Sequence, residues 1–282
     1  MTIHEWLKQA VNKLKAAGIE TARLDALILL SDEVGHDKGF LLAHPEEEIS
    51  TPQLAKLDNL LTTRATHMPL AYLRGKAEFY GREFIVNPSV LVPRPETETM
   101  IEVLLEIFTG LKIHDVLPSD GRQWKIADVG TGSGAVGITA ALELPETAFT
   151  LLDIDEAALE IAKANVINLS TTCKVVHTNL LQGINTDFDV LLCNLPYVPD
   201  TYQINTAAGH EPKIAIFGGQ DGLDVYRQLF DQIKIVANKP LYILTEALPQ
   251  SQATLTAIAI HAGYELRKSD DFIQVFSPAH HN

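Results

Sequence analysis

The sequence is poor in cysteine and has fewer basic than acidic residues. Only two cysteines, Cys173 and Cys193, occur among the 282 residues. Both lie in apolar, β-prone stretches without the close spacing of zinc ligands, so we expect two buried thiols and no metal site. Lys and Arg total 22 against 36 Asp and Glu, a formal net charge of −14. Such a surface repels phosphate backbones and anionic lipid, and without clustered Lys and Arg it argues against a nucleic-acid partner.

Long apolar runs are also missing. No run approaches the roughly 20 residues that a bilayer span requires, so we expect no membrane partner. The first residues, MTIHEWLKQA, do not show the basic-then-apolar order of a secretory signal. We therefore expect a cytoplasmic protein. We also expect it to be a monomer. Its length allows two domains.

The first 60 residues carry apolar side chains at helical spacing, which predicts a small helical domain. Thr21 is a candidate N-cap of its second helix, Gly35 a candidate end of that helix, and Ser50 a candidate start of the next. Between Pro69 and Pro95 the pattern changes to short β-prone pieces, AEFYGREFIV and SVLV, which predict a hairpin linker. We therefore divide the chain into a helical domain over residues 1–75, a β-hairpin linker over 76–98 and a third domain over 99–282.

The third domain alternates strand-like and helical runs. A helix from about Glu96 to Thr109 leads into it, followed by a polar stretch with Pro118, Asp120 and Gly121. Seven apolar runs then read as strands: WKIADV, AFTLLD, CKVVHT, FDVLLCN, PLYILTE, YELRK and FIQVFS. Their near-continuous apolar character predicts an α/β fold with a mostly parallel sheet covered by helices on both faces. Such sheets bind ligands at the carboxyl ends of their strands.

A glycine-rich loop follows the first of these strands. Its residues are Gly130, Thr131, Gly132, Ser133 and Gly134, directly before a helical run. Glycines at alternate positions let the backbone turn sharply and approach a ligand closely. Asp153, at the end of the second strand, is placed to accept hydrogen bonds from both ribose hydroxyls of an adenosine. NAD and S-adenosylmethionine (SAM) share this group.

Two features bear on the choice between these cofactors. Gly132, Gly134 and Gly137 fit the G-x-G-x-x-G pattern of dinucleotide-binding loops, which leaves an NAD-dependent oxidoreductase open. Asp128, two residues before the first glycine, would attract the cationic methionine end of SAM but repel a pyrophosphate. This carboxylate favours SAM.

A second candidate feature is the corner after the run FDVLLCN. The side-chain oxygen of Asn194 and the carbonyl of Leu195 can accept the two hydrogens of a substrate NH2 group. Pro196 makes the corner rigid, and Tyr197 offers a flat face to a planar amide or base. Because an amide nitrogen is a poor nucleophile, we expect catalysis by positioning rather than by acid-base chemistry. An asparagine that only satisfies a turn is the alternative.

These motifs together resemble the glutamine methyltransferases that modify peptide chain release factors. The resemblance covers nearly the whole chain, through ARLDALILL, PLAYLRGKAEFYGREF, VLVPRPETE, DVGTGSGA, NLPY and HEPKIAIFGGQDGLDVYR. It implies a Rossmann-like, seven-stranded SAM-dependent methyltransferase domain that follows an N-terminal helical bundle and a β-hairpin linker. It also implies methyl transfer from SAM to the glutamine side-chain nitrogen in the Gly-Gly-Gln tip of a release factor, which the helical domain grips.

The resemblance also implies roles for single residues. The loop from Gly130 to Gly134 would line the methionine part of SAM, Asp153 would bind the ribose, and Asn179 with Leu180 would lie near the adenine. The corner from Asn194 to Tyr197 would clamp the glutamine. Asn194, Pro196 and Tyr197 would be catalytic, Leu195 would bind substrate, and Asn194 would also border the cofactor.

Residues outside these two motifs take part as well. In the family the linker with Arg94, Glu96 and Thr97 faces the active site, although a loop-stabilising ion pair is an alternative role for Arg94 and Glu96. A loop after the fourth strand would be shaped by Glu211, Pro212 and the pair Gly218-Gly219.

The sequence departs from the family at three places, one of which is the closing strands, which lack an arginine-rich stretch. Leu195 replaces the first of two prolines, and because this position acts through its carbonyl, we expect function to survive. Asn179-Leu180 replaces an acid and an aromatic near the adenine, which predicts weaker SAM binding. NLPY is also the form found in ribosomal RNA adenine dimethyltransferases, so an RNA or DNA adenine methyltransferase is the main alternative. A SAM-binding module without catalysis is another, against which the intact Asn194 and Tyr197 argue.

Overall fold

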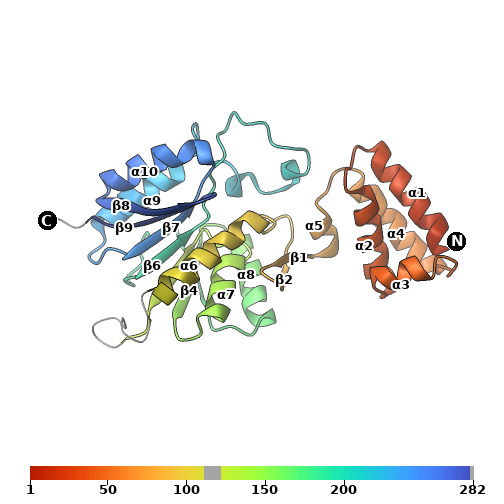
Figure 1. The fold of residues 1–282 in the computed structure, drawn as a ribbon, viewed down its shortest axis with the longest axis horizontal. Helices are drawn as coiled ribbons and strands as arrows, with labels where there is room; N and C mark the ends of the chain where they lie inside the picture. The colour runs from red at the N-terminus through yellow and green to blue at the C-terminus, as the bar shows by residue number, and fades with distance from the viewer. Residues whose placement is uncertain (111–121, 280–282) are drawn as a thin grey trace. The chain divides into compact units, whose positions relative to one another are not determined.

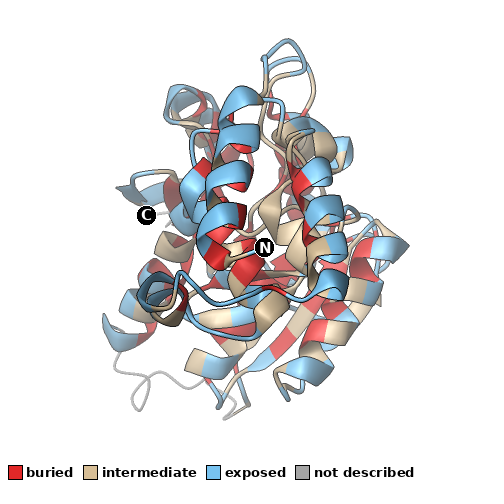
Figure 2. Ribbon diagram, turned by 90° about the vertical axis from the view of Figure 1, so that its right-hand side faces the viewer, coloured by how far each residue is buried: buried red, intermediate tan, exposed pale blue. Residues whose placement is uncertain are grey.

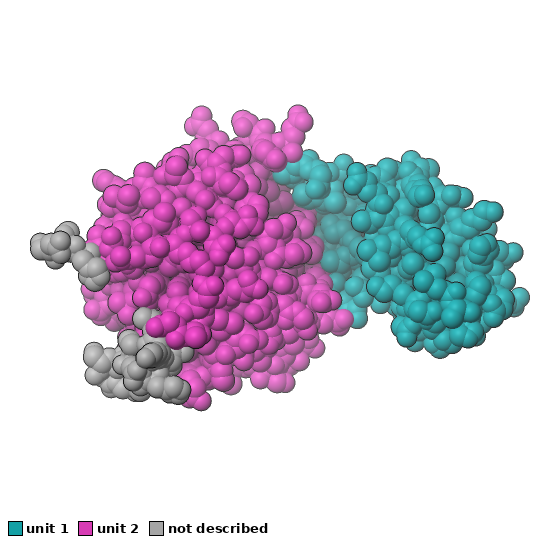
Figure 3. Space-filling model, in the orientation of Figure 1, with its two compact units in different colours: residues 1–76, 204–210 teal, residues 77–203, 211–282 magenta. Residues whose placement is uncertain are grey.

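The computed structural model describes residues 1–110 and 122–279. The polar stretch with Pro118, Asp120 and Gly121 lies outside the described residues. The described chain divides into two compact units (Figure 3). Met1–Lys76 forms the first unit together with Ile204–His210, a segment from much later in the chain. The remaining described residues form the second unit, which includes the hairpin.

The first unit is a bundle of helices. They are α1 (Ile3–Ala16), α2 (Ala22–Val34), α3 (Lys38–Ala43), α4 (Thr51–Arg64) and α5 (Leu70–Arg74). The first helix shows how the sequence builds the bundle, because Ile3, Trp6, Ala10 and Leu14 recur on one face and are all buried. Figure 2 shows the exposed residues of these helices along their outer sides.

The ends of these helices follow local capping chemistry. The Thr2 side chain accepts a hydrogen bond from the Glu5 amide, and the Glu5 carboxylate accepts one from the Thr2 amide. Gly35 ends α2 in the left-handed conformation, as expected. Thr21 stands at the N-cap of α2 as predicted, and its carbonyl accepts from the Asp25 amide. Its hydroxyl makes no capping hydrogen bond among the described residues, because φ of −83° and ψ of 15° hold the backbone in a turn rather than in the extended conformation of most capping residues.

The second unit begins with the predicted hairpin. Strand β1 (Lys76–Phe79) pairs with β2 (Arg82–Ile85), and the turn places Tyr80 and Gly81 at φ values of 51° and 68°. The second β-prone piece, SVLV, is not a strand. Prolines flank it at positions 88 and 93, and the amide of Val92 donates to a carboxylate of Glu211 instead of to a neighbouring strand.

A seven-stranded sheet forms the core of the second unit (Figure 1). Its strands are β3 (Lys125–Val129), β4 (Ala148–Asp153), β5 (Lys174–His177), β6 (Val190–Cys193), β7 (Tyr242–Glu246), β8 (Tyr264–Asp270) and β9 (Ile273–Pro278). They lie in the order β5-β4-β3-β6-β7-β9-β8. The first five are parallel, and β9 runs antiparallel to both of its neighbours. The predicted α/β fold with seven strands is confirmed.

Helices cover both faces of this sheet. Figure 1 shows α6 (Glu98–Gly110), α7 (Ala135–Glu143) and α8 (Glu156–Asn168) on one face, and α9 (Asp224–Ile235) and α10 (Gln252–His261) on the other. Successive residues of a buried strand serve opposite faces: in β6, Val190 and Leu192 belong to the first core, and Leu191 and Cys193 to the second. Short 3₁₀ turns occur at Pro95–Thr97, Ala208–His210, Lys213–Ala215 and Pro249–Ser251.

The fold also shows the state of the cysteines and the character of the helices. Cys173 and Cys193 are both buried free thiols, as expected. Within the described residues no helix combines the length and apolar character that a membrane crossing requires.

Candidate active site

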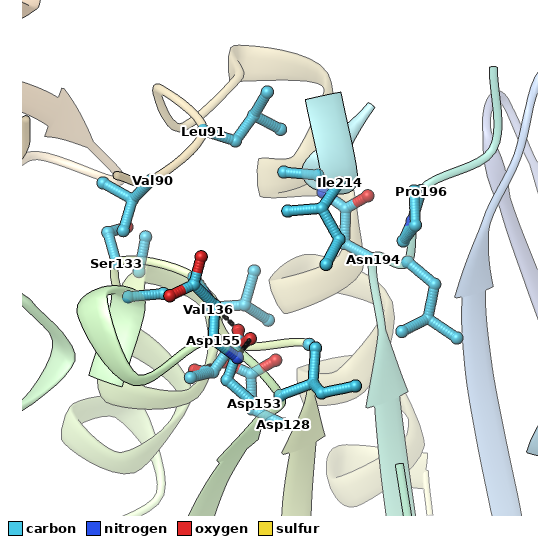
Figure 4. Close-up of a pocket in the computed structure, with 18 of the residues that line it drawn as sticks. Val90, Leu91, Asp128, Ser133, Val136, Asp153, Asp155, Asn194, Pro196 and Ile214 are labelled. Atoms are coloured by element: carbon cyan, nitrogen blue, oxygen red, sulfur yellow. Dashed lines mark hydrogen bonds between the residues drawn. The ribbon is translucent and has the colours of Figure 1, made fainter. Parts of the chain in front are cut away.

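A cavity of about 290 Å³ lies at the carboxyl ends of the parallel strands. Gly130, Asp153, Thr178 and Asn194, which end or follow four adjacent strands, all line it. Its volume is near the lower end of the range for small-molecule sites, about 300 to 1,000 Å³. Figure 4 shows Asn194 on one side of this space and Ser133 on the other, with the side chains of Asp128 and Asp153 beneath.

The glycine loop forms the floor of the cavity. Gly130, Gly132 and Gly134 have φ values of 72°, 54° and 82°, a region that L side chains rarely adopt. A Cβ at Gly132 would meet no described atom within 4 Å, so its backbone borders open space. A Cβ at Gly130 would come within 2.9 Å of Leu195 Cδ2. The loop therefore leaves room for a ligand above Gly132 and packs on the corner at Gly130.

Asp128 holds the loop from below. Its Oδ2 accepts hydrogen bonds from Thr131 Oγ1 at 2.6 Å and from the Gly137 amide at 2.8 Å. The side chain is only 2% exposed, and this burial raises its pKa from 3.8 to about 6. The carboxylate thus braces the loop and also borders the cavity, where it adds negative charge for a cationic ligand.

Asp153 holds the loop from the side. Its Oδ2 accepts from the Gly132 amide at 2.8 Å, and its Oδ1 accepts from the Asp155 amide at 2.9 Å. Burial raises its pKa, against hydrogen bonds that lower it. Each carboxylate oxygen has a further lone pair, so Asp153 can still accept from two ligand hydroxyls. The two hydroxyl donors of an adenosine ribose fit these acceptor positions.

Asn179 and Leu180 line the cavity beyond β5. Asn179 is exposed and Leu180 is buried, with φ at 57°. The turn is held from α9, because the Leu181 amide donates to Gln232 Oε1 at 2.8 Å. Leu180 therefore gives an apolar wall where an aromatic ring would stack more strongly on a base.

Asn194 has its side chain oriented by the linker. Its Nδ2 donates to Thr97 Oγ1 at 3.1 Å, which leaves Oδ1 as the acceptor that remains for a ligand. Thr97 is 2% exposed and belongs to the 3₁₀ turn Pro95–Thr97. Both residues line the cavity. The linker and the corner thus form one polar unit although 97 positions separate them in the chain.

Two of the predicted site residues do not line the cavity. Gly134 begins α7 as its N-cap, behind the loop. Tyr197 lies behind the corner, where its hydroxyl donates to Glu246 Oε1 at 2.9 Å. Burial, and then the charge of Glu246, raise the pKa of Tyr197, so the phenol is neutral. The other predicted residues, Gly130, Thr131, Gly132, Ser133, Asp153, Asn179, Leu180, Asn194, Leu195 and Pro196, all line the cavity.

The loop after β6 is backed by a glycine-rich segment. A Cβ at Gly218 would collide with the carbonyl oxygen of Pro196, and one at Gly222 would collide with that of Tyr197. Val198 also forms a bridge with Phe217 on this segment. The backbones therefore pack face to face, which only glycine permits at these two positions.

Arg94 pairs with Glu211 rather than with Glu96. Its guanidinium bonds to Glu211 Oε1, while Glu211 Oε2 accepts from the Val92 amide at 3.1 Å. The carboxylate of Glu211 is 2% exposed, so the pair is desolvated on one side. This pair joins the linker to the segment that backs the corner.

Sequence reasoning missed several lining residues. Val90, Leu91, Val136, Ile214 and Gln228 contribute to the wall, and they come from four separate segments of the chain. Val90 and Leu91 lie in the linker motif VLVPRPETE, which was the available signal for them. Among the described residues no group of three or more His, Cys, Asp or Glu side chains is arranged to hold a metal ion.

The seven-stranded sheet, with its strand order, glycine loop and acidic residue at the end of β4, defines a Rossmann-like class I SAM-dependent methyltransferase. Two family profiles agree with this class. The profile described as "PrmC N-terminal domain" matches residues 5–75, and "Methyltransferase small domain" matches residues 111–212.

Curated relatives then specify the family. A release factor glutamine methyltransferase of Koribacter versatilis (strain Ellin345) is 36% identical over 239 residues, which cover 83% of this chain and 81% of that protein. The release factor glutamine methyltransferase of Bacillus subtilis (strain 168) is 34% identical, with 87% and 84% covered. This chain belongs to the release factor glutamine methyltransferase family, and the predicted resemblance is confirmed.

Other relatives share only part of their length or only the fold. A bifunctional methyltransferase of Rickettsia bellii (strain RML369-C) is 31% identical over 93% of this chain, which spans 51% of that protein. The solved hMettl16 catalytic domain in complex with MAT2A 3'UTR hairpin 6 is 15% identical, with a TM-score of 0.53 and 83% of each chain covered. At that identity the likeness shows the fold alone.

Proposed function

We propose that this protein transfers the methyl group of SAM to the side-chain nitrogen of the glutamine in the Gly-Gly-Gln tip of peptide chain release factors. The observation that carries the proposal is the oriented carboxamide of Asn194 beside the cavity that the glycine loop and Asp153 also line, in a chain that belongs to the release factor glutamine methyltransferase family. SAM is the methyl donor and supplies an electrophilic methyl group.

The cofactor is held by the strand ends. The glycine loop from Gly130 to Ser133 accommodates the methionine part, with Asp128 as the nearby negative charge. The ribose hydroxyls bind Asp153, whose two oxygens are already aligned by backbone amides. Asn179 and Leu180 border the adenine. Because stacking is replaced by a leucine contact, we still predict weaker SAM binding than an aromatic residue would give.

The glutamine is held by the corner. Asn194 Oδ1 and the Leu195 carbonyl accept the two hydrogens of its amide, and Pro196 restricts the backbone between Leu195 and Tyr197. Both acceptors would direct the nitrogen lone pair toward the methyl group and stabilise the positive charge that develops on nitrogen. As the N–CH3 bond forms, the S–CH3 bond of SAM breaks, S-adenosylhomocysteine leaves with the electron pair, and the methylated nitrogen loses one proton to solvent. Holding two reactants in line is worth up to roughly 7 to 11 kcal/mol when complete, so no strong base is needed.

We further propose that the helical unit recognises the release factor and that the enzyme acts as a monomer in the cytoplasm. Light scattering on purified protein tests the oligomeric state, and a mass of two chains would contradict it.

Labelled SAM tests the proposed activity. The enzyme is incubated with release factor, with a release factor whose tip glutamine is replaced by alanine, and with ribosomal RNA. We expect label on the unmodified release factor alone. Label on RNA would establish the adenine methyltransferase alternative, and equal label on the tip variant would exclude glutamine as the acceptor.

A further inference from the structure

Glu246 is a buried acid that the proposed chemistry does not use. It is the last residue of β7 and is 1% exposed. In the parallel pairing of β6 with β7, Cys193 lies opposite Thr245, so Asn194 and Glu246 come next on adjacent strands. Glu246, at the end of β7, therefore lies beside Asn194, the residue that directly follows β6.

The carboxyl group of Glu246 contacts the last residue of the corner. Its Oε1 accepts the hydrogen bond from the Tyr197 hydroxyl at 2.9 Å. Burial raises its pKa, and the neighbouring hydroxyls of Thr97 and Tyr197 lower it. Thr97 is also the residue that accepts from Asn194 Nδ2. The carboxyl group of Glu246 thus bonds to Tyr197, which ends the corner, and lies near Thr97, which orients Asn194.

The backbone of Glu246 is tied to the same region. The Tyr226 hydroxyl lies 2.6 Å from the Glu246 carbonyl oxygen and 2.9 Å from the Cys193 carbonyl oxygen, and its single hydrogen is shared between these two acceptors. Tyr226 is fully buried and comes from α9. This hydroxyl joins the ends of β6 and β7, so a shift of Glu246 would be transmitted to the residue before Asn194.

Packing alone does not explain why the second carboxyl oxygen of Glu246 is in the interior. Oε2 is buried and has no hydrogen-bond partner among the described residues. Leaving a buried polar atom unpaired costs about 1 to 3 kcal/mol, which an apolar side chain of similar size would avoid. An acid at such a position indicates a use for its hydrogen bonds.

We propose that Glu246 is a positioning residue for the methyl transfer, which fixes Tyr197 directly and, through Tyr197, the corner that Asn194 begins. The inference rests on the proposed function of the corner as the glutamine clamp. It adds a residue that touches neither ligand, since Glu246 does not line the cavity. Glu246 fixes the last residue of the four-residue corner while Thr97 fixes the first, which keeps the two acceptor oxygens aimed at one point.

Two substitutions separate the hydrogen bond from the bulk of the side chain. Glu246→Gln keeps an oxygen that can accept from Tyr197, so we expect a kcat close to that of the unaltered enzyme. Glu246→Ala removes it, and because hydrogen bonds to charged groups contribute about 1.5 to 3 kcal/mol, we expect kcat to fall about tenfold to hundredfold. SAM affinity should change little in both. Glu265→Gln is the matched control, because Glu265 is a half-buried acid on β8 that pairs with Arg267 and does not line the cavity.

A double-mutant cycle tests whether Glu246 acts through Tyr197. Tyr197→Phe removes the donor of the same hydrogen bond. If the two residues act as a unit, Glu246→Ala with Tyr197→Phe should lose little more activity than Glu246→Ala alone. Fully additive losses would overturn the direct link.

Hydrogen exchange gives a readout that does not depend on the substrate. Without release factor, Glu246→Ala should speed amide exchange in residues 194–200 and leave residues 130–134 unchanged. Faster exchange throughout the second unit, with equal losses in Glu246→Gln, would show a structural role only and overturn the inference. If the unaltered enzyme transfers no methyl group to release factor, the proposed function fails, while the exchange comparison still decides whether Glu246 fixes the corner.

Discussion

The side chain of Leu195 lies against the backbone of Gly130, so the corner after β6 touches the glycine loop after β3 directly. Leu195 is 2% exposed and packs in the core that also contains Val129 and Cys193. A leucine at this position therefore fills space beside the loop, whereas its carbonyl serves the substrate. The contact explains how the chain can depart from the family's proline without opening a gap between the two halves of the site.

Leu195→Ala tests this division of roles. Removing a buried leucine side chain lowers the free energy of unfolding by about 2 to 5 kcal/mol. The carbonyl stays, so we expect kcat to change only a few fold. Urea denaturation and steady-state kinetics measure the two effects. A large loss of kcat with unchanged stability would mean that the side chain acts on the substrate.

Asn194→Ala removes the proposed amide acceptor. We expect transfer to be abolished, because the glutamine nitrogen is no longer held in line with the methyl group. SAM affinity, measured by calorimetry, should stay within a few fold of the original value, since the loop and Asp153 are untouched. An active variant would overturn the clamp.

Thr97 is expected to act through Asn194. Thr97→Val keeps the shape but leaves the Asn194 amide without its acceptor, at a cost of about 1 to 3 kcal/mol, so kcat/KM should fall about tenfold or more. Thr97→Ser keeps a hydroxyl and serves as the control with near-normal kcat/KM. Equal losses in both variants would show that packing matters and the hydrogen bond does not.

Gly218 is expected to tolerate no side chain. In Gly218→Ala the new methyl group would meet the Pro196 carbonyl and push the corner away, which costs about 1 to 3 kcal/mol and lowers kcat. Gly209→Ala is the control, because a Cβ there meets no described atom within 4 Å. Thermal unfolding and kinetics of the two variants should differ clearly; similar behaviour would contradict the close approach.

Asp128 should make stability depend on pH. Its pKa is about 6 when folded against 3.8 when unfolded, so the folded state binds the proton more tightly. The stabilising contribution is present below pH 3.8 and is lost as the pH rises through about 6. Roughly two pKa units at 1.36 kcal/mol each amount to about 3 kcal/mol. The stability of Asp128→Asn relative to the unaltered protein should rise by this amount between about pH 4 and 7, and parallel curves from urea denaturation would contradict the assignment.

Local patterns predicted the strands, the glycine loop and the corner, because strand periodicity and turn chemistry depend on residues that are neighbours in the sequence. The pairs that orient the site lie far apart in the chain: Thr97 with Asn194, Tyr197 with Glu246, and Arg94 with Glu211. No local signal identifies such partners, since they depend on which strands become neighbours. The failed expectation at SVLV has the same origin, because the Val92 amide bonds to Glu211, a residue far along the chain, instead of to a neighbouring strand.

Peptide mass spectrometry of a release factor after reaction with the enzyme and SAM decides the proposed activity. The tryptic fragment that contains the Gly-Gly-Gln tip should carry one methyl group on the glutamine side-chain nitrogen, and the same fragment should stay unmodified with the Asn194→Ala enzyme. A methyl group on any other residue, or an unmodified tip while RNA becomes methylated, would contradict the proposed function.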